Sequence, residues 1–163
     1  MQDFVHLHVH TQYSLLDGQA SVARLVDKAI KNGMKGIAVT DHGNMFGIKE
    51  FTNYVNKKNG GPKGEIKDLK KRIADIESGK IECENIEQEI ADCKAKMAEA
   101  ESRLFKPIIG CEMYVARRTM DLKEGKPDQS GYHLVVLAKN EKGYHNLIKL
   151  VSHAWTRGYY MRP

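Results

Sequence analysis

The sequence predicts a mixed α/β fold, because apolar stretches of strand length alternate with stretches of helical periodicity. Runs rich in β-branched residues are typical of strands, and they cover residues 36–40, 106–116 and 132–138. The chain has 163 residues, of which 41% are hydrophobic, and this is enough for one core of ordinary size. We therefore expect one globular domain or part of one.

The first predicted strand contains three alternating histidines. Apolar residues separate His6, His8 and His10 between residues 4 and 11, so the three imidazoles fall on one face by the two-residue period of a strand. A lone histidine on a strand face is most often a hydrogen-bonded core or surface residue. Converging neutral imidazoles suit a transition metal better than a packed core. This stretch alone leaves both interpretations open.

The next segment has the pattern of a strand, a loop and a helix that lead to a buried strand. Ser21 is a plausible N-cap of a helix that stops at 32–33, where Asn and Gly follow one another. The buried strand 36–40 ends abruptly in the polar residues 41–44, and α/β folds place their sites where parallel strands end. A further helix is predicted over about 46–58.

Residues 60–105 differ in composition from the rest of the chain. Aromatic residues are nearly absent, and apolar residues step by three and four on both sides of Ser78-Gly79-Lys80. We expect an antiparallel helical hairpin that is inserted in the α/β body, either as a docking arm for a partner or as a tolerated surface elaboration.

The formal net charge of +5 is unevenly distributed. Segment 60–105 holds nine basic and eleven acidic side chains, whereas the remaining chain holds seventeen and ten. The basic excess therefore belongs to the part that contains the histidines, which is a weak indication of contact with nucleic acid.

The α/β pattern then resumes. The apolar strand 106–116 contains Glu112, whose charge is costly there unless a cation or hydrogen bonds satisfy it. A charged loop leads to strand 132–138, which has His133 near its start, and Asn140 is the predicted N-cap of a last helix.

Eight ionisable residues stand where the pattern would not otherwise tolerate them. They are His6, His8, His10, Asp17, Asp41, His42, Glu112 and His133. Imidazoles with a few carboxylates, one of which can bridge two ions, match a multinuclear site of Zn, Mn or Fe type. The reaction class that this chemistry suggests is metal-assisted phosphoester hydrolysis.

Composition also bears on the cellular compartment. The cysteines Cys83, Cys93 and Cys111 are odd in number and form no CxxC pair, so we expect reduced, mostly buried thiols. No apolar run approaches the ~20 residues that span a bilayer, and the N-terminus lacks the layout of a secretory signal. We expect a cytoplasmic protein that makes no membrane contact.

Four motifs follow one another along the chain: His8-Val9-His10-Thr11 with Ser14-Leu15-Leu16-Asp17-Gly18, Thr40-Asp41-His42-Gly43-Asn44, Pro107-Ile108-Ile109-Gly110-Cys111-Glu112 and Tyr132-His133-Leu134. In this order they resemble the motifs of the PHP (polymerase and histidinol phosphatase) family. More narrowly, they are similar to the PHP domains at the N-terminus of bacterial replicative DNA polymerase III alpha subunits. The resemblance covers residues 2–59 and 105–163, whereas these subunits usually pass directly from the second helix to the following strand.

The resemblance implies a fold and a domain organisation. Residues 1–163 would be the N-terminal part of a PHP domain, a distorted (β/α)7 barrel, with the helical hairpin 60–105 inserted within it. The later motifs of the family, which supply further ligands, would lie beyond Pro163, so the chain is expected to stop roughly halfway round the barrel.

The resemblance also implies a site. The ligands of a multinuclear centre of two or three divalent ions, Zn, Mn or Fe, would be His8, His10, Asp17, His42, Glu112 and His133. Glu112 matches the bridging carboxylate, and Glu112, Asp17 and His42 would act in catalysis. His6 and Asp41 match neighbours of the ligands and are expected to orient imidazoles.

The implied function is that of the PHP part of a DNA-directed DNA polymerase, a nucleotidyltransferase of DNA replication. The polymerase carboxylates are absent from this chain, so any polymerase activity would belong to the parent protein. The metal centre would serve as a hydrolase for phosphodiesters, such as a 3′–5′ exonuclease. Expected partners are DNA, through the parent, and other polymerase III subunits, among them the proofreading subunit.

Three alternatives stay open. The domain could be a metal-stabilised structural platform without turnover. It could also be a free-standing PHP phosphoesterase of the histidinol-phosphatase type, which the polymerase-like residues 15–18 and 43–47 disfavour. The third alternative is the PHP domain of a family X polymerase, but that domain normally sits at a C-terminus, whereas Met1 here opens the domain.

Overall fold

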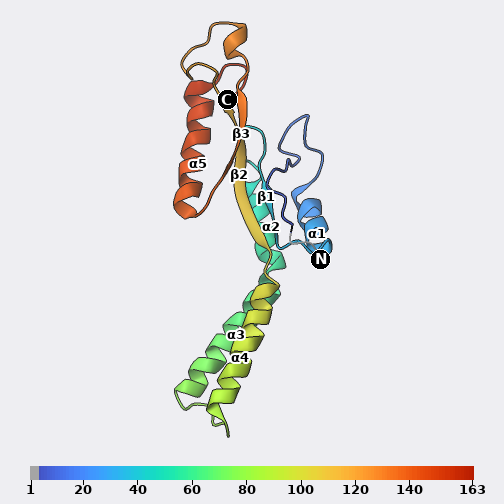
Figure 1. Cartoon of the computed structure of the whole chain (residues 1–163), viewed down its shortest axis with the longest axis vertical. Coiled ribbons are helices and arrows are strands. Elements are labelled where there is room, and N and C mark those ends of the chain that lie inside the picture. Colours follow the sequence, from blue (N-terminus) through green and yellow to red (C-terminus); the bar gives the residue numbers. More distant parts are fainter. Residues whose placement is uncertain (1–3) are drawn as a thin grey trace. The chain divides into compact units, whose positions relative to one another are not determined.

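The computed structural model describes residues 4–163 and confirms a mixed α/β fold (Figure 1). The chain divides into two compact units. We call the first, which comprises the residues up to Tyr54 together with Lys106–Pro163, the α/β unit. The second, Val55–Phe105, is called the hairpin unit.

A three-stranded sheet lies at the centre of the α/β unit. Its order is β1 (Gly36–Val39), β2 (Lys106–Val115) and β3 (Tyr132–Leu137), and each strand lies within a stretch that the sequence pattern predicted to be a strand. β1 and β2 are parallel, whereas β2 and β3 are antiparallel. The connection from β2 to β3 contains only a short 3₁₀ turn at Lys126–Asp128, and no crossover helix that could return the chain for a parallel pairing. The (β/α)7 barrel therefore stays a prediction.

The predicted strand over residues 4–11 is wrong. The backbone bends after His6, and only two ladder-like bonds join this stretch to the sheet: Ala38 N–H to His6 O and Thr40 N–H to Val9 O. The bonded positions are three residues apart in the N-terminal stretch, from His6 to Val9, but two residues apart in the sheet, from Ala38 to Thr40. The N-terminal stretch therefore has one extra residue between the two bonds. This irregularity removes the strict alternation that would place the three histidines on one face.

The helices of the α/β unit begin where the sequence places N-caps. α1 (Val22–Lys31) follows Ser21, whose Oγ accepts from the Arg24 N–H, and α5 (Glu141–His153) follows Asn140, whose Oδ1 accepts from the Gly143 N–H. α2 (Ile48–Lys58) begins two residues after its predicted start.

A small core joins α5 to the sheet. Cys111 of β2 packs with Leu147 and Val151 of α5, and Met113 and Val136 lie against them. Figure 1 shows α5 running alongside β2 and β3. The core fixes β2, and with it the residue that follows Cys111, which is Glu112.

The hairpin unit contains α3 (Gly60–Glu77) and α4 (Ile86–Ser102), which lie side by side in Figure 1. Its base is closed by Asn59, whose side-chain amide donates to Phe105 O and accepts from Phe105 N–H, at 2.8 and 2.9 Å. An exposed ion pair joins Arg72 of α3 to Glu89 of α4. That the unit is an insertion into the family fold stays a prediction.

The cysteines and the helices can be compared with what the composition led us to expect. The cysteines are free; Cys93 and Cys111 are buried and Cys83 is partly exposed. Burial raises the pKa of Cys111 to about 12, so this thiol is protonated at neutral pH. None of the helices among the described residues is both long and apolar enough to cross a bilayer.

Candidate metal centre

The register of the parallel strands brings His42 beside Glu112. β1 ends at Val39, which is paired with Ile109, and three residues further on His42 and Glu112 form an isolated parallel bridge in the same register. The Gly43 N–H donates to Glu112 O at 2.9 Å. The polar residues after β1 thus lie against the one acidic residue of β2.

The antiparallel pairing adds His133. Glu112 stands opposite Val135, and His133 stands opposite Tyr114. His133 and Glu112 are therefore diagonal neighbours on one face of the sheet, which long side chains can span. The Nδ1 of His133 lies 2.7 Å from Oε1 of Glu112.

A buried threonine fixes the two histidines of the N-terminal stretch. Thr40 Oγ1 accepts from the Val9 N–H at 2.8 Å and donates to Val9 O at 3.1 Å, which holds the residue between His8 and His10. The Nε2 atoms of His8 and His10 then lie 2.6 and 2.8 Å from Oε2 of Glu112. These two nitrogens are 3.1 Å apart.

The side chains form two groups of three ligands that share Glu112. In one group, His8, His10 and Glu112 place a ligand atom each within 4.8 Å of one another, and in the other group His42, Glu112 and His133 do so. Oε2 of Glu112 lies near ring nitrogens of His8, His10 and His42, and Oε1 lies near Nδ1 of His133, so both carboxylate oxygens face imidazoles. The 52% exposure of the His8 side chain leaves the centre open to solvent.

Glu112 is 4% exposed, and its environment keeps it ionised. Burial acts to raise the pKa of this carboxyl group, but hydrogen bonds with His8 and His133 lower it, and the pKa lies below its ordinary value. The centre therefore holds a buried anion surrounded by imidazoles.

His42 is held in its neutral form. Burial lowers the pKa of the imidazole most, and the neighbouring His10 lowers it further, against the opposing effect of Glu112. Its buried Nδ1 has no hydrogen-bond partner among the described residues and lies 3.5 Å from Oε2 of Glu112. A neutral imidazole with an unpartnered nitrogen near a carboxylate is suited to bind a metal ion together with that carboxylate.

A hydrogen-bonded chain through Ser14 fixes the proton of His10. Ser14 Oγ donates to Asp41 Oδ1 at 2.9 Å and accepts from the His42 backbone N–H at 3.0 Å. Its one proton is thus used, so His10 Nδ1, at 3.0 Å, donates to it. His10 Nε2 then turns a lone pair toward a Glu112 oxygen, and a cation bound between the two atoms would relieve this contact. The donor set fits a divalent ion.

Asp41 is buried at the centre of this chain. Besides Ser14, its carboxylate accepts the N–H of Thr11 at 2.6 Å and the hydroxyl of Thr11 at 2.8 Å. Asp41 thus anchors the loop that carries Ser14 and does not itself face the ring nitrogens of the cluster.

The remaining two sequence-predicted residues lie at or beyond the rim. Asp17 Oδ2 is 3.4 Å from His42 Nε2, on a side chain that is 60% exposed. His6 is exposed and packs its ring edge-on against Phe4, and no hydrogen bond or ion pair joins its side chain to the cluster within residues 4–163. The structure therefore brings together six of the eight residues around Glu112 and Ser14, with Asp17 at the rim, and leaves His6 outside.

Two glycines allow the close approaches around the centre. A Cβ on Gly18 would lie 1.8 Å from Thr11 O, so only glycine closes the loop after Asp17. Gly43 has φ +58° and a Cβ there would meet Pro163 and Tyr114 at 2.7 and 3.1 Å.

Sequence reasoning assigned no role to Ser14, Thr40 or Tyr114. Ser14 and Thr40 are uncharged residues in loops and strand ends, where hydroxyls are common, so only the partners in space identify them. Tyr114 stacks its ring on His42, with centroids 5.8 Å apart and an interplanar angle of 13°. Tyr114 follows Glu112 by two residues and so lies on the same face of β2, and this spacing is the one feature of the sequence that could have placed it near the centre.

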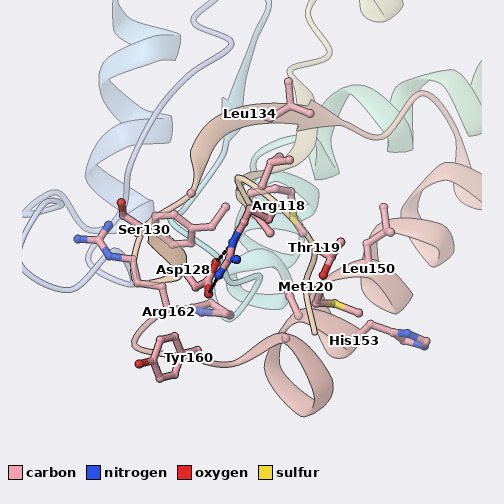
Figure 2. Close-up of a pocket in the computed structure, with 18 of the residues that line it drawn as sticks. Arg118, Thr119, Met120, Asp128, Ser130, Leu134, Leu150, His153, Tyr160 and Arg162 are labelled. Carbon is pink, nitrogen blue, oxygen red and sulfur yellow. Dashed lines mark hydrogen bonds and ion pairs between the residues drawn. The ribbon is translucent and has the colours of Figure 1, made fainter. Parts of the chain in front are cut away.

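A separate pocket of about 930 Å³ lies between the sheet, α5 and the charged loop, and Figure 2 shows it. Leu134 and Leu150 give it an apolar lining, and an ion pair between Arg118 and Asp128 closes one side. The ligands of the candidate metal centre are not among its lining residues. The pocket and the metal centre are therefore distinct features.

Comparisons with known proteins show the family to which the chain belongs. The chain is similar to the DNA polymerase III subunit alpha of Borreliella burgdorferi, at 38% identity over 163 residues, 98% of this chain and 10% of that protein. It is also similar to those of Treponema pallidum (38%, 98% and 10%) and Aquifex aeolicus (33%, 99% and 11%). The chain spans about a tenth of the length of these curated relatives. The model of the PHP domain family matches residues 6–163. The chain belongs to the PHP domain family.

Proposed function

We propose that this chain is the PHP part of a DNA polymerase III alpha subunit and that its metal centre hydrolyses phosphodiester bonds, as a 3′–5′ exonuclease would. The observation that carries the proposal is Glu112, a buried carboxylate shared by two groups of three ligands. Two adjacent ions joined by one carboxylate are the arrangement that phosphoester hydrolysis uses in many enzymes.

The proposed ligands divide between the two groups. His8, His10 and Glu112 would hold one Zn, Mn or Fe ion, and His42, Glu112 and His133 a second. Asp17, at the exposed rim beside His42, is in position to contribute to a third ion or to hold the His42 ring. The bound ions would supply an activated water and would neutralise the charge of the phosphate.

The side chains around the ions set the orientation of the ligands. Ser14 and Asp41 hold the proton of His10 on Nδ1, so that Nε2 is free to bind. Burial of His42 lowers the pKa of this imidazole, which favours the neutral form that binds a metal ion. The exposure of the His8 side chain leaves the proposed ions accessible from solvent.

The context of the proposed activity follows from the relatives. They are DNA polymerase III alpha subunits, so DNA and the other polymerase III subunits, including the proofreading subunit, are the proposed partners of the parent protein. DNA synthesis itself would belong to parts of such a protein that this chain does not span.

The test of the proposal is Glu112→Gln. The substitution keeps the shape of the side chain and removes the charge that both groups share, so we expect metal content to fall by at least one ion per chain. Hydrolysis from the 3′ end of single-stranded DNA should fall at least about a hundredfold, since even residues that only orient ligands cost 10–100-fold. Elemental analysis and an end-labelled oligonucleotide measure the two quantities.

The matched control is Glu141→Gln, which makes the same change on the exposed first turn of α5 and should alter neither quantity. Unchanged metal stoichiometry in Glu112→Gln would contradict the bridging role. Metal without any hydrolysis in the unsubstituted protein would contradict the proposed activity and would make the centre a structural staple.

A further inference from the structure

Three aromatic side chains lie exposed beside the metal centre. Phe46, Trp155 and Tyr159 are 67%, 42% and 50% exposed. Trp155 stacks on Tyr159 with ring centroids 5.7 Å apart and an interplanar angle of 18°, and Phe46 lies 6.2 Å from Trp155. We call these three residues the aromatic platform. Contiguous exposed apolar surface of this kind marks a binding site more often than a scattered single residue does.

The aromatic platform is tied to the metal centre by the backbone. Trp155 Nε1–H donates to Gly43 O at 2.7 Å, and Gly43 follows the candidate ligand His42. Phe46 stands four residues after His42 in the same loop. Trp155 itself lies in a five-residue π-helix, Ala154–Gly158, and such local departures from α-helix are frequent at functional sites.

A cation without an ion-pair partner among the described residues also lies near His42. The guanidinium of Arg162 sits 5.0 Å above the ring of Tyr114, which in turn stacks on His42. Within residues 4–163 no carboxylate forms an ion pair with Arg162. The aromatic platform and this cation therefore both lie next to the residues proposed to hold the metal ions.

We propose that the aromatic platform stacks unpaired bases of a single-stranded DNA end, with Arg162 on the backbone phosphate, and so guides the terminal phosphodiester to the metal centre. This inference rests on the proposed function. Base stacking on aromatic side chains is tolerant of sequence and needs bases freed from a duplex, and a basic groove that follows the backbone usually accompanies it. The basic excess of the chain outside 60–105 has the required sign.

The chain contains its own probe, because Trp155 is its single tryptophan. We would titrate the full 163-residue chain, with chelator present, with an oligothymidylate and follow tryptophan fluorescence. Stacking of a base on Trp155 should quench the emission. An abasic oligonucleotide of the same length, which keeps the phosphates and lacks the bases, should quench little, and so should a duplex.

Two variants test the aromatic platform and the cation. Phe46→Ala should weaken oligothymidylate binding roughly tenfold, in line with the loss of one stacked base. The matched control Phe4→Ala removes another exposed phenylalanine, 52% exposed, and should leave the affinity unchanged. Arg162→Gln should weaken binding and reduce its dependence on salt. Circular dichroism of each variant verifies that the fold is kept.

The outcomes separate this inference from the proposed function. Quenching by the abasic strand equal to that by oligothymidylate, or no quenching by either, would overturn the base-stacking role. Because the titration is done without metal, quenching in a protein that shows no hydrolysis would contradict only the proposed activity. Hydrolysis without quenching would contradict only the aromatic platform.

Discussion

At the scale of single residues, the hydroxyl of Ser14 determines the hydrogen bonds that position His10 and His42 in the candidate metal centre. It stands between the buried carboxylate of Asp41 and Nδ1 of His10, and it also accepts the backbone N–H of His42. One uncharged side chain thus sets the tautomer of one proposed ligand and the position of another. Such hydrogen bonds from outside the ligand set fix the orientation of the ligands and tune their basicity.

Ser14→Ala should therefore weaken metal binding 10–100-fold although Ser14 is no ligand. Without the hydroxyl, His10 is free to place its proton on Nε2, the nitrogen that faces Glu112 at 2.8 Å. Isothermal titration of the metal-free protein measures the affinity.

The control for this change is Ser21→Ala, which removes a serine hydroxyl that caps α1 and touches no part of the centre. It should cost roughly 1 kcal/mol of folding stability and leave the metal affinity intact. Equal affinity in Ser14→Ala and the unsubstituted protein would show that the tautomer is set by other contacts.

The ionisable residues of the centre could be picked out from the sequence, but the hydrogen bonds that position them could not. His8, His10, His42, Glu112 and His133 interrupt apolar patterns, and an unpaired charge or ring there is costly, which makes them visible. A serine or threonine in a loop carries no such penalty. His6 looked equivalent to His8 because the period of a strand makes them so, and the bend after His6 separates them.

At the scale of elements, capping residues and strand composition predicted most of the boundaries. The side chains of Ser21 and Asn140 begin α1 and α5 as the sequence indicated. The failed strand at residues 4–11 has a physical cause, because Thr40 offers its hydroxyl to Val9 N–H in place of a ladder carbonyl. Strand direction also escaped prediction, since it depends on what the connecting segment 117–131 folds into.

The hairpin unit should be dispensable for metal binding. The proposed ligands all lie in the α/β unit, and the base of the hairpin unit is closed by Asn59 and Phe105. We expect a protein in which a short glycine linker replaces 62–104 to bind metal with the affinity and stoichiometry of the full chain, as measured by the same titration. Loss of binding would mean that α3 and α4 are part of the architecture of the site.

At the scale of the whole molecule, the division into two compact units predicts that metal stabilises them unequally. A ligand that binds only the folded state stabilises the unit that binds it, by about 2.7 kcal/mol at a hundredfold excess over the dissociation constant. For a unit of this size, that corresponds to a rise in melting temperature on the order of 10 °C. The α/β unit holds the candidate ligands, and the hairpin unit contributes none of them.

Two spectroscopic probes distinguish the units. Trp155, the single tryptophan, lies in the α/β unit, whereas far-ultraviolet circular dichroism includes the long helices α3 and α4 of the hairpin unit. Added metal should raise the melting temperature that tryptophan fluorescence reports and leave a separate helical transition where it was. In a His8→Ala, His10→Ala double variant, which removes one of the two proposed groups, metal should raise the melting temperature that fluorescence reports by less than in the unsubstituted protein and should again leave the helical transition unchanged. A single transition that moves as one in both probes would contradict the division, because it would require the stabilisation of the metal centre to reach helices that contain none of its ligands.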